Sequence, residues 1–192
     1  MAKTRKPIEP KQNVETEAES TEKGVGVHFR WMIRRDMPEV LEIENKSFDF
    51  PWEEDDFIRC LHQRNCIGIV AEQADRVVGY MVYELEKGQL RILNFAVCPT
   101  LRRASVGRQM MTKMIGKLSH TRRKYLTTEI RETNLPAQLF FRSMGFRCVS
   151  VLRGFYDDTT EDALCFSYDV RGRDEVDRAC ELFHSTERIE IK

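Results

Sequence analysis

The strongest constraint on the fold is a run of three strand-like segments separated by very short connections. Residues 66–72, 76–86 and 89–97 are rich in β-branched and aromatic side chains, which favour extended backbone. The connections contain Ala74-Asp75 and Lys87-Gly88, and connections of this length join antiparallel neighbours. The sequence therefore predicts a three-stranded antiparallel meander in the middle of the chain.

Helices and strands are also expected on both sides of this meander. Before it, Val27 to Ile33 alternates as a strand does, and two helices follow, the first capped by Asp36 and the second over 53–61. After it come a helix over 105–118, a strand over 125–130, a helix over 135–143 that ends at Gly145, and strands over 146–152 and 163–170. The predicted order is β-α-α-β-β-β-α-β-α-β-β, an α/β (α+β) fold with a mixed, largely antiparallel sheet flanked by helices.

The helix over 105–118 has an unusual number of methionines on one face. Met110, Met111 and Met114 recur at helical spacing together with Val106 and Leu118. Methionine fills irregular gaps between packed elements, so we expect this stripe to belong to the core and not to a binding surface.

The two ends of the chain differ in character from the segment between them. Residues 1–26 contain five Lys/Arg and five Glu but no aromatic residue, so they cannot bury enough apolar surface to offset the entropy of ordering. We expect a disordered tail there, a folded domain over 27–171 and a C-terminal helical extension over 172–192. The last prediction depends on Val176, Ala179, Cys180 and Phe183, which fall on one helical face.

Composition narrows the class of protein without naming a function. With 31 Lys/Arg and 31 Asp/Glu among 192 residues, the balance of charge indicates neither a nucleic-acid nor a membrane partner. No apolar run is long enough to span a bilayer, and the N-terminus lacks the apolar core of a signal peptide. We therefore expect a cytoplasmic protein.

The six cysteines show no C-x-x-C pair. Cys60, His62 and Cys66 could supply three ligands to zinc, but a fourth ligand at matching spacing is missing. We expect reduced thiols and no metal.

A loop that could bind an anion follows the third strand of the meander. The strand ends at Pro99, and a basic stretch of small residues then opens a helix. Free N–H groups and the helix dipole point toward an anion at such a helix N-terminus, and flanking arginines add charge-assisted hydrogen bonds. The alternative is a solvated run of charge.

The segment from Arg102 to Gly107 resembles motif A of the GNAT acetyltransferase superfamily, R/Q-x-x-G-x-G/A. The resemblance implies that acetyl-CoA is the co-substrate, held by backbone amides of the loop and of the strand before it. Ser105 replaces the first glycine of the motif, so its Cβ crowds the phosphate, or the residue adopts an ordinary φ and donates its hydroxyl. The cofactor-binding residues implied are Phe95, Ala96, Val97, Arg103, Ala104, Ser105, Val106, Gly107 and Arg108.

Four further segments resemble the RimI-type ribosomal-protein-alanine acetyltransferases of that superfamily. Phe50-Pro51-Trp52-Glu53 resembles their F-P-W-[ST]-x loop, and residues 126–134 resemble the strand end L-x-x-E-V-R-x-S-N. Met144-Gly145-Phe146 resembles their helix-to-strand turn, and residues 153–163 resemble R-x-Y-Y…E-D-A. The matches extend over about residues 28–170 in order and imply that Phe50, Pro51, Trp52 and Tyr156 line the acceptor site.

The resemblance also assigns chemical roles. Glu129 matches the family's catalytic glutamate and would act as the base through a water molecule; the alternative is a surface glutamate paired with an arginine. Asn134 would bond the CoA arm, and it also suits the N-cap of the next helix. Both roles can coexist.

One position departs from the expected mechanism. The family's tyrosine, which protonates the leaving thiolate, corresponds to Phe141, and phenylalanine has no proton to give. We expect a slower enzyme or one whose acid is another group, with Tyr156 the nearest candidate by motif. Loss of catalysis is the third alternative.

An acidic run near the Phe50 loop gives an independent indication of the substrate. Nine acidic residues lie between Asp36 and His62, against Lys46 and Arg59. Such a surface would attract a cationic peptide, for example the N-terminus of a ribosomal protein, although a solvated helix face is the simpler interpretation. The nine are Asp36, Glu39, Glu42, Glu44, Asp49, Glu53, Glu54, Asp55 and Asp56.

The leading hypothesis from the sequence is an acetyl-CoA-dependent N-acetyltransferase that acts on the N-terminal α-amine of a protein. The alternatives are a GNAT enzyme that acetylates lysine side chains or small amines, and a non-catalytic module that binds acetyl-CoA.

Overall fold

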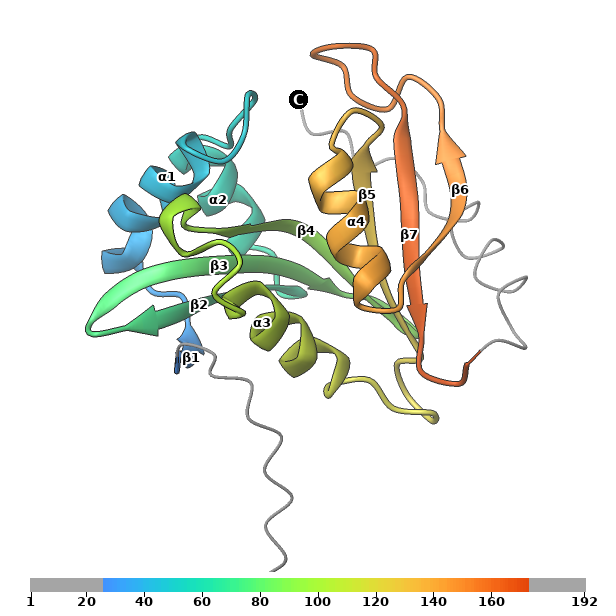
Figure 1. Ribbon diagram of the computed structural model, residues 1–192, viewed down its shortest axis with the longest axis horizontal. Helices are drawn as coiled ribbons and strands as arrows, with labels where there is room; N and C mark the ends of the chain where they lie inside the picture. The colour runs from blue at the N-terminus through green and yellow to red at the C-terminus, as the bar shows by residue number, and fades with distance from the viewer. Residues whose placement is uncertain (1–25, 173–192) are drawn as a thin grey trace, which may run out of the picture.

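The computed structural model describes residues 26–172, in which seven strands form one sheet in the order β1-β2-β3-β4-β5-β7-β6 (Figure 1). All neighbouring strands are antiparallel except β4 and β5, which are parallel. The elements are β1 (His28–Trp31), η1 (Arg34–Asp36), α1 (Met37–Asn45), α2 (Glu54–Leu61), β2 (Cys66–Gln73), β3 (Arg76–Leu85), β4 (Gln89–Val97), η2 (Pro99–Leu101), α3 (Val106–Ile115), β5 (Tyr125–Arg131), α4 (Leu135–Ser143), β6 (Arg147–Leu152) and β7 (Ala163–Asp169).

The predicted order of helices and strands is confirmed, and so is the antiparallel meander of β2, β3 and β4. Ala74 and Asp75 both have positive φ, 47° and 59°, as a tight two-residue hairpin turn requires. Gly145 has a φ of 91° after α4, consistent with its predicted role as a helix stop. The predicted tail over 1–26 and the predicted helical extension over 172–192 lie outside the described residues, apart from Gly26 and Gly172.

Asp36 occupies the N-cap position of α1 as predicted, but the predicted hydrogen bond from its side chain to the helix is absent. Its carboxylate instead accepts bonds from the Arg30 guanidinium at 2.6 and 2.9 Å and from the Ile33 N–H at 2.9 Å. A bidentate charged pair is stronger than a bond to one helix N–H, so the carboxylate turns toward β1.

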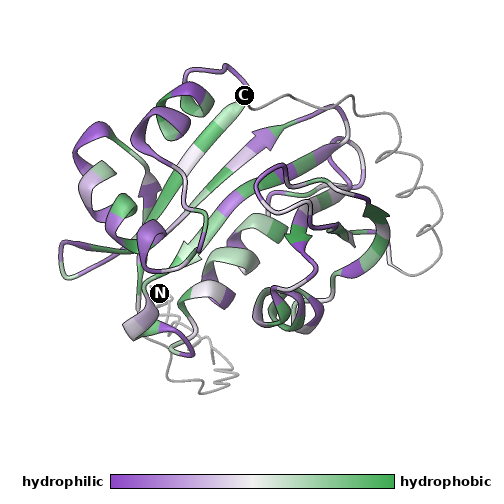
Figure 2. Ribbon diagram, turned by 90° about the horizontal axis from the view of Figure 1, so that it is seen from above, coloured by the Kyte–Doolittle hydropathy of each residue, from purple (hydrophilic) through white to green (hydrophobic). Residues whose placement is uncertain are grey.

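The core has two parts, one on each face of the sheet. On one face, α3 and α4 cover apolar residues of β2 to β5, and Met110, Met111 and Met114 are completely buried. On the other face, α1 and α2 cover Val70, Tyr80 and Val82. Figure 2 shows the apolar residues along the strands and on the inner sides of the helices. The methionine stripe is therefore part of the core, as predicted.

Strands β4 and β5 pair over only four residues and then separate. Their parallel register extends from Gln89↔Tyr125 to Ile92↔Thr128. Leu93 is an extra residue in β4, because Ile92 and Asn94 face consecutive β3 residues, and such a bulge bends a strand. Beyond Leu93 the edge of β4 that faces β5 has no ladder partner, and Figure 1 shows the two strands parting there.

Among residues 26–172, no helix has the length and apolar character needed to cross a membrane. This observation agrees with the absence of a long apolar run in the sequence.

The buried methionines give a test of the core. Met111→Ala is expected to lower the free energy of unfolding by about 2–5 kcal/mol, because it leaves a cavity at a completely buried site. Leu139→Ala on α4 is the control, since Leu139 is 57% exposed and its loss should change the free energy by less than about 0.5 kcal/mol. Urea denaturation measures both, and equal effects would contradict the assignment of the core.

Candidate active site

The loop between β4 and α3 has the backbone of an anion-binding turn. Arg103 and Ser105 both adopt left-handed φ, 64° and 63°, and α3 begins at Val106. Turns that contain left-handed residues direct successive N–H groups to one side, where they form a concave site for an anion. The first-turn N–H groups of Val106, Gly107 and Arg108 have no acceptor within the helix. These donors fit a phosphate group.

The positive charge expected around this loop is present. Arg102, Arg103 and Arg108 are all exposed. Arg102 also reaches back to the segment after α1, where its guanidinium donates to the Ser47 hydroxyl at 3.0 Å. The loop is thus charged and anchored to the α1–α2 connection.

Ser105 does not have the ordinary φ that was one of the two expectations for it. Its φ of 63° lies in the left-handed region, which glycine adopts without strain but a residue with a Cβ does not. Its hydroxyl makes no capping bond to α3. The residue therefore keeps the backbone conformation of the motif at a cost of about 1–2 kcal/mol for a residue with a Cβ.

The β4 residues expected near a cofactor follow the bulge directly. Ala96 is buried against the α1 and α2 side, whereas Phe95 and Val97 pack on the α3 side. The Phe95 ring lies 5.8 Å from the ring of Phe140, and a methyl group at Gly107 would lie 3.5 Å from both rings. This contact brings β4, the first turn of α3 and α4 together.

Phe141 belongs to an aromatic cluster and not to an open surface. It is 4% exposed, and its ring contacts those of Phe95, Phe140 and Phe146 edge to face, with the Phe146 centroid 5.0 Å away. The position predicted to lack the catalytic acid is thus filled by a packed ring.

Glu129 lies on β5 just beyond the last pair with β4 and is bound by an arginine. The Arg91 Nε donates to both carboxylate oxygens, at 3.0 and 3.2 Å, and the Glu129 side chain is only 9% exposed. Burial raises the pKa of Glu129 above its usual value, and Arg91 opposes the rise. The sequence allowed a surface glutamate paired with an arginine as the alternative to a catalytic base. The arginine partner is present, but the pair is largely buried.

Tyr156, in the connection between β6 and β7, lies close to Glu129. Burial raises the pKa of its phenol well above the usual value, and the Glu129 charge raises it further, while Arg131 opposes both effects. The Tyr156 hydroxyl therefore stays protonated at neutral pH. Tyr156 also contacts Arg131, two residues after Glu129, so both side chains belong to the region at the end of β5.

The residues of the Phe50-Pro51-Trp52 segment point in different directions. Trp52 faces inward, where its ring lies 5.2 Å from that of Phe57. Phe50 is 48% exposed, and its ring centroid lies 4.8 Å from the guanidinium carbon of Arg131. Pro51 is half-buried between them. Of the three, Phe50 is the most exposed.

Glu44 was missed as a site residue, and it holds this segment in place. It is 1% exposed, and its Oε1 accepts from the Trp52 N–H at 2.7 Å and from the Asn94 side chain at 3.0 Å. Its Oε2 is bonded to the Tyr80 hydroxyl, and burial raises the pKa of the carboxyl. The sequence did contain a signal for its burial, because Glu44 lies four residues after Val40 and therefore on the apolar face of α1.

Asn134 occupies the N-cap of α4, and its Oδ1 accepts from the Ala137 N–H at 3.1 Å. The predicted capping role is confirmed. Its Nδ2 has no acceptor in the part of the chain that the structure describes, and the amide could donate to a ligand.

The acidic run does not form one continuous surface. Four of its nine residues are held in ion pairs, Asp36 with Arg30, Glu39 with Arg76, Glu42 with Lys46 and Asp56 with Arg59. Glu44 is buried. The exposed residues of the run with no ion pair among residues 26–172 are Asp49, Glu53, Glu54 and Asp55, so the expected acidic surface is smaller than the sequence indicated.

The cysteine cluster has a different arrangement from a metal site. The Cys60 and Cys66 sulfur atoms lie 3.1 Å apart in the core, and five of the six cysteines are described as free thiols. In the described part of the chain, no three His, Cys, Asp or Glu side chains are grouped to hold a metal.

Comparison with known proteins places this geometry in a family. Residues 37–146 match the acetyltransferase (GNAT) family. The chain is 29% identical over 136 residues to a Bacillus subtilis protein provisionally named as a ribosomal protein bS18-alanine N-acetyltransferase, a match that covers 70% of this chain and 90% of the relative.

Two solved structures have the same fold. The ribosomal-protein-S18-alanine N-acetyltransferase from Escherichia coli superposes with a TM-score of 0.67 at 22% identity, over 78% of this chain and 97% of that one. Arabidopsis thaliana NAA60 in complex with acetyl-CoA superposes with a TM-score of 0.66 at 17% identity, over 76% of this chain and all of that one.

The Arg91–Glu129 pair gives a pH-dependent prediction. Arg91→Met should destabilise the protein by about 2 kcal/mol or more at pH 8, because an ionised Glu129 is then buried without its partner. Glu129 has a raised pKa in the folded state, so its protonated form is the one that folding favours. The cost of losing Arg91 should therefore shrink as the pH falls through that pKa and Glu129 becomes neutral.

Urea denaturation of both proteins from pH 4.5 to pH 8 measures this effect. Arg153→Met is the matched control, since Arg153 pairs with Asp162 but is 83% exposed. A destabilisation by Arg91→Met that does not change with pH would contradict the buried charge pair.

Proposed function

Because the chain belongs to the acetyltransferase (GNAT) family, we propose that it transfers an acetyl group from acetyl-CoA to the N-terminal α-amine of a protein, with a ribosomal protein as the acceptor. The observation that carries the proposal is the separation of β4 and β5 after Ile92. One side of this separation leads to the anion-binding turn, and the other carries Glu129. A thioester held along β4 would thus face a carboxylate on β5.

Acetyl-CoA fits the residues on the β4 side. Backbone N–H groups of residues 103–108 would hold its diphosphate, except that of Ala104, which donates to the Leu101 carbonyl at 3.3 Å. The backbone of Phe95, Ala96 and Val97 would bind the pantetheine arm, because this edge of β4 has no ladder partner. The Asn134 side-chain amide would donate to the same arm.

The β5 side supplies the acid–base groups. Acetyl-CoA provides a thioester whose carbonyl carbon accepts the amine nitrogen and whose thiolate leaves. Glu129 would take the proton from the amine, and its raised pKa makes it a stronger base than an exposed carboxylate. The Arg91 guanidinium would favour the ionised, basic form of this carboxylate. Tyr156, whose phenol is protonated, would give a proton to the leaving thiolate and regain one from solvent.

The preference for a protein N-terminus rests on the relatives and on the acceptor-side residues. The similar enzyme from E. coli acts on an alanine of ribosomal protein S18 by its name. Phe50 and Tyr156 come from two loops that meet at the end of β5, next to the proposed base. An α-amine at the end of a flexible chain can enter between such loops, and the exposed acids Asp49 and Glu53 would attract a basic segment behind it.

Peptides with free and blocked N-termini test the substrate class. A basic peptide with a free α-amine should be acetylated, and the same peptide with a blocked N-terminus but free lysines should not. Glu129→Gln should lower kcat by about 10²–10⁴-fold, as is typical for loss of a general base. Mass spectrometry locates the acetyl group, and acetyl-CoA binding without release of CoA would favour a non-catalytic module instead.

The identity of the acid has its own test. Tyr156→Phe should lower kcat at least about tenfold with little change in the KM for acetyl-CoA, because it removes the proton donor. Phe141→Tyr in the Tyr156→Phe background should restore part of the rate, since it returns a hydroxyl to the family's usual position. An unchanged kcat for Tyr156→Phe would mean that the thiolate leaves without this acid.

A further inference from the structure

The Arg131 side chain, at the end of β5, makes several ion pairs and two cation–π contacts. The proposed acetyl transfer assigns no chemical role to Arg131. It lies two residues after Glu129, so both side chains are on the same face of the strand, roughly 7 Å apart along it. The Arg131 side chain is only 21% exposed. It therefore lies beside the proposed base and not out in solvent.

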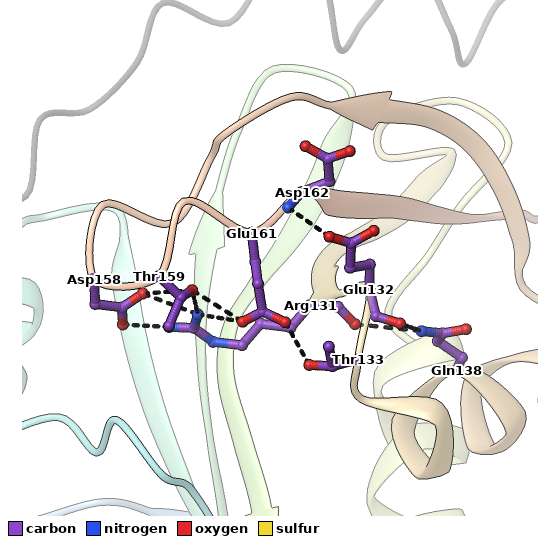
Figure 3. A network of polar contacts seen from close by, with 8 residues as sticks. All are labelled: Arg131, Glu132, Thr133, Gln138, Asp158, Thr159, Glu161 and Asp162. Atoms are coloured by element: carbon purple, nitrogen blue, oxygen red, sulfur yellow. Dashed lines mark hydrogen bonds and ion pairs between the residues drawn. The ribbon is translucent and has the colours of Figure 1, made fainter.

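The guanidinium binds the β6–β7 connection at several points. It is paired with both oxygens of Asp158, and its Nη1 donates to Glu161 at 2.9 Å and to the Thr159 hydroxyl at 2.8 Å (Figure 3). Arg131 holds the pKa of Asp158 below its usual value, and that of Glu161 is lowered by Thr133 and then by Arg131. This is a network of charge-assisted bonds, which is worth more than a single surface pair.

The same guanidinium also stacks on two aromatic rings from different parts of the chain. Its carbon lies 3.8 Å from the Tyr156 ring centroid and 4.8 Å from that of Phe50. Both distances are within the range of cation–π attraction. One side chain on β5 thus contacts the α1–α2 segment and the β6–β7 connection at once.

The backbone of Arg131 is fixed as well. Its residue pairs with Ala163 of β7, and its carbonyl accepts from the Asn134 N–H at 3.0 Å and from the Gln138 side chain at 3.3 Å. The starting point of the side chain is therefore set by β7 and α4. Because the backbone of Arg131 is fixed, its side chain can hold the loops that it binds at a defined position.

We propose that Arg131 is a positioning residue that joins the α1–α2 and β6–β7 segments into one acceptor-binding surface and sets where the acceptor N-terminus lies relative to Glu129. This inference rests on the function proposed above. Phe50 and Tyr156 bind the first residues of the acceptor from two sides, and Arg131 fixes the spacing between the two rings. The acetyl-CoA side of the site does not depend on it, because no contact of Arg131 reaches the anion-binding turn in the described part of the chain.

Steady-state kinetics with a free N-terminal peptide provide the main test. Arg131→Gln should raise the KM for the peptide by about 5–30-fold, as expected for losing a cation–π contact together with a bidentate pair. The KM for acetyl-CoA should stay within about twofold, since the two substrates bind on different sides. Arg131→Lys keeps the charge but not the planar fork, so its effect should be intermediate.

Arg153→Gln is the matched control. Arg153 is in the same β6–β7 connection and pairs with Asp162, but within residues 26–172 it makes no cation–π contact with Phe50 or Tyr156. Both KM values of this variant should stay within about twofold of the parent. An equal rise in both KM values for Arg131→Gln, or an unchanged peptide KM, would overturn the inference.

Hydrogen exchange separates joint positioning from a purely local role. In Arg131→Gln, amides of residues 46–52 and of residues 153–162 should both exchange faster, whereas amides of α3 should not change. Faster exchange in 153–162 alone would also overturn the inference. If the parent enzyme acetylates no free N-terminal peptide, the proposed function fails instead, and the exchange experiment still tests the link between the two segments.

Discussion

The separation of β4 from β5 is the constraint on which the rest of the site depends. Backbone N–H and C=O groups inside a sheet are normally paired, and here the pairing stops at Ile92 and Thr128. Leu93 is inserted opposite β3 at the same point, so β4 bends while β5 continues straight alongside β7. A single extra residue thus leaves one strand edge free to bind a ligand and places the end of β5 across from it.

The two edges carry different chemistry because of what surrounds them. The β4 edge leads into a turn that uses left-handed residues and a helix N-terminus, both of which favour an anion. At the end of β5, burial shifts upward the pKa of Glu129 and that of Tyr156, which comes from the β6–β7 connection. Arg91 opposes the rise in the pKa of Glu129, because its positive charge favours the ionised carboxylate.

The proposed acceptor side depends on long-range contacts around the buried Glu44 and the half-buried Arg131. The Glu44 carboxylate accepts a bond from the Trp52 N–H and is also bonded to Tyr80 of β3 and Asn94 of β4. The Arg131 guanidinium contacts the rings of both Phe50 and Tyr156. Buried polar groups of this kind cost free energy unless all their partners are in place. Their partners come from four different elements, so the shape of the acceptor side is a property of the assembled fold.

The sequence by itself determined the order of elements and the meander, because each of these follows from local periodicity, short turns or residue type. The sequence also predicted a phosphate site at residues 102–108, from the resemblance to motif A together with the arginines beside a helix N-terminus. The pairing of Arg91 with Glu129, separated by 38 positions, could not be derived in this way. The same holds for Glu44 and Arg131, and for the left-handed φ of Ser105, which local preference opposes. Only the tertiary structure decided these features, because packing across the sheet selects partners that periodicity along the chain does not specify.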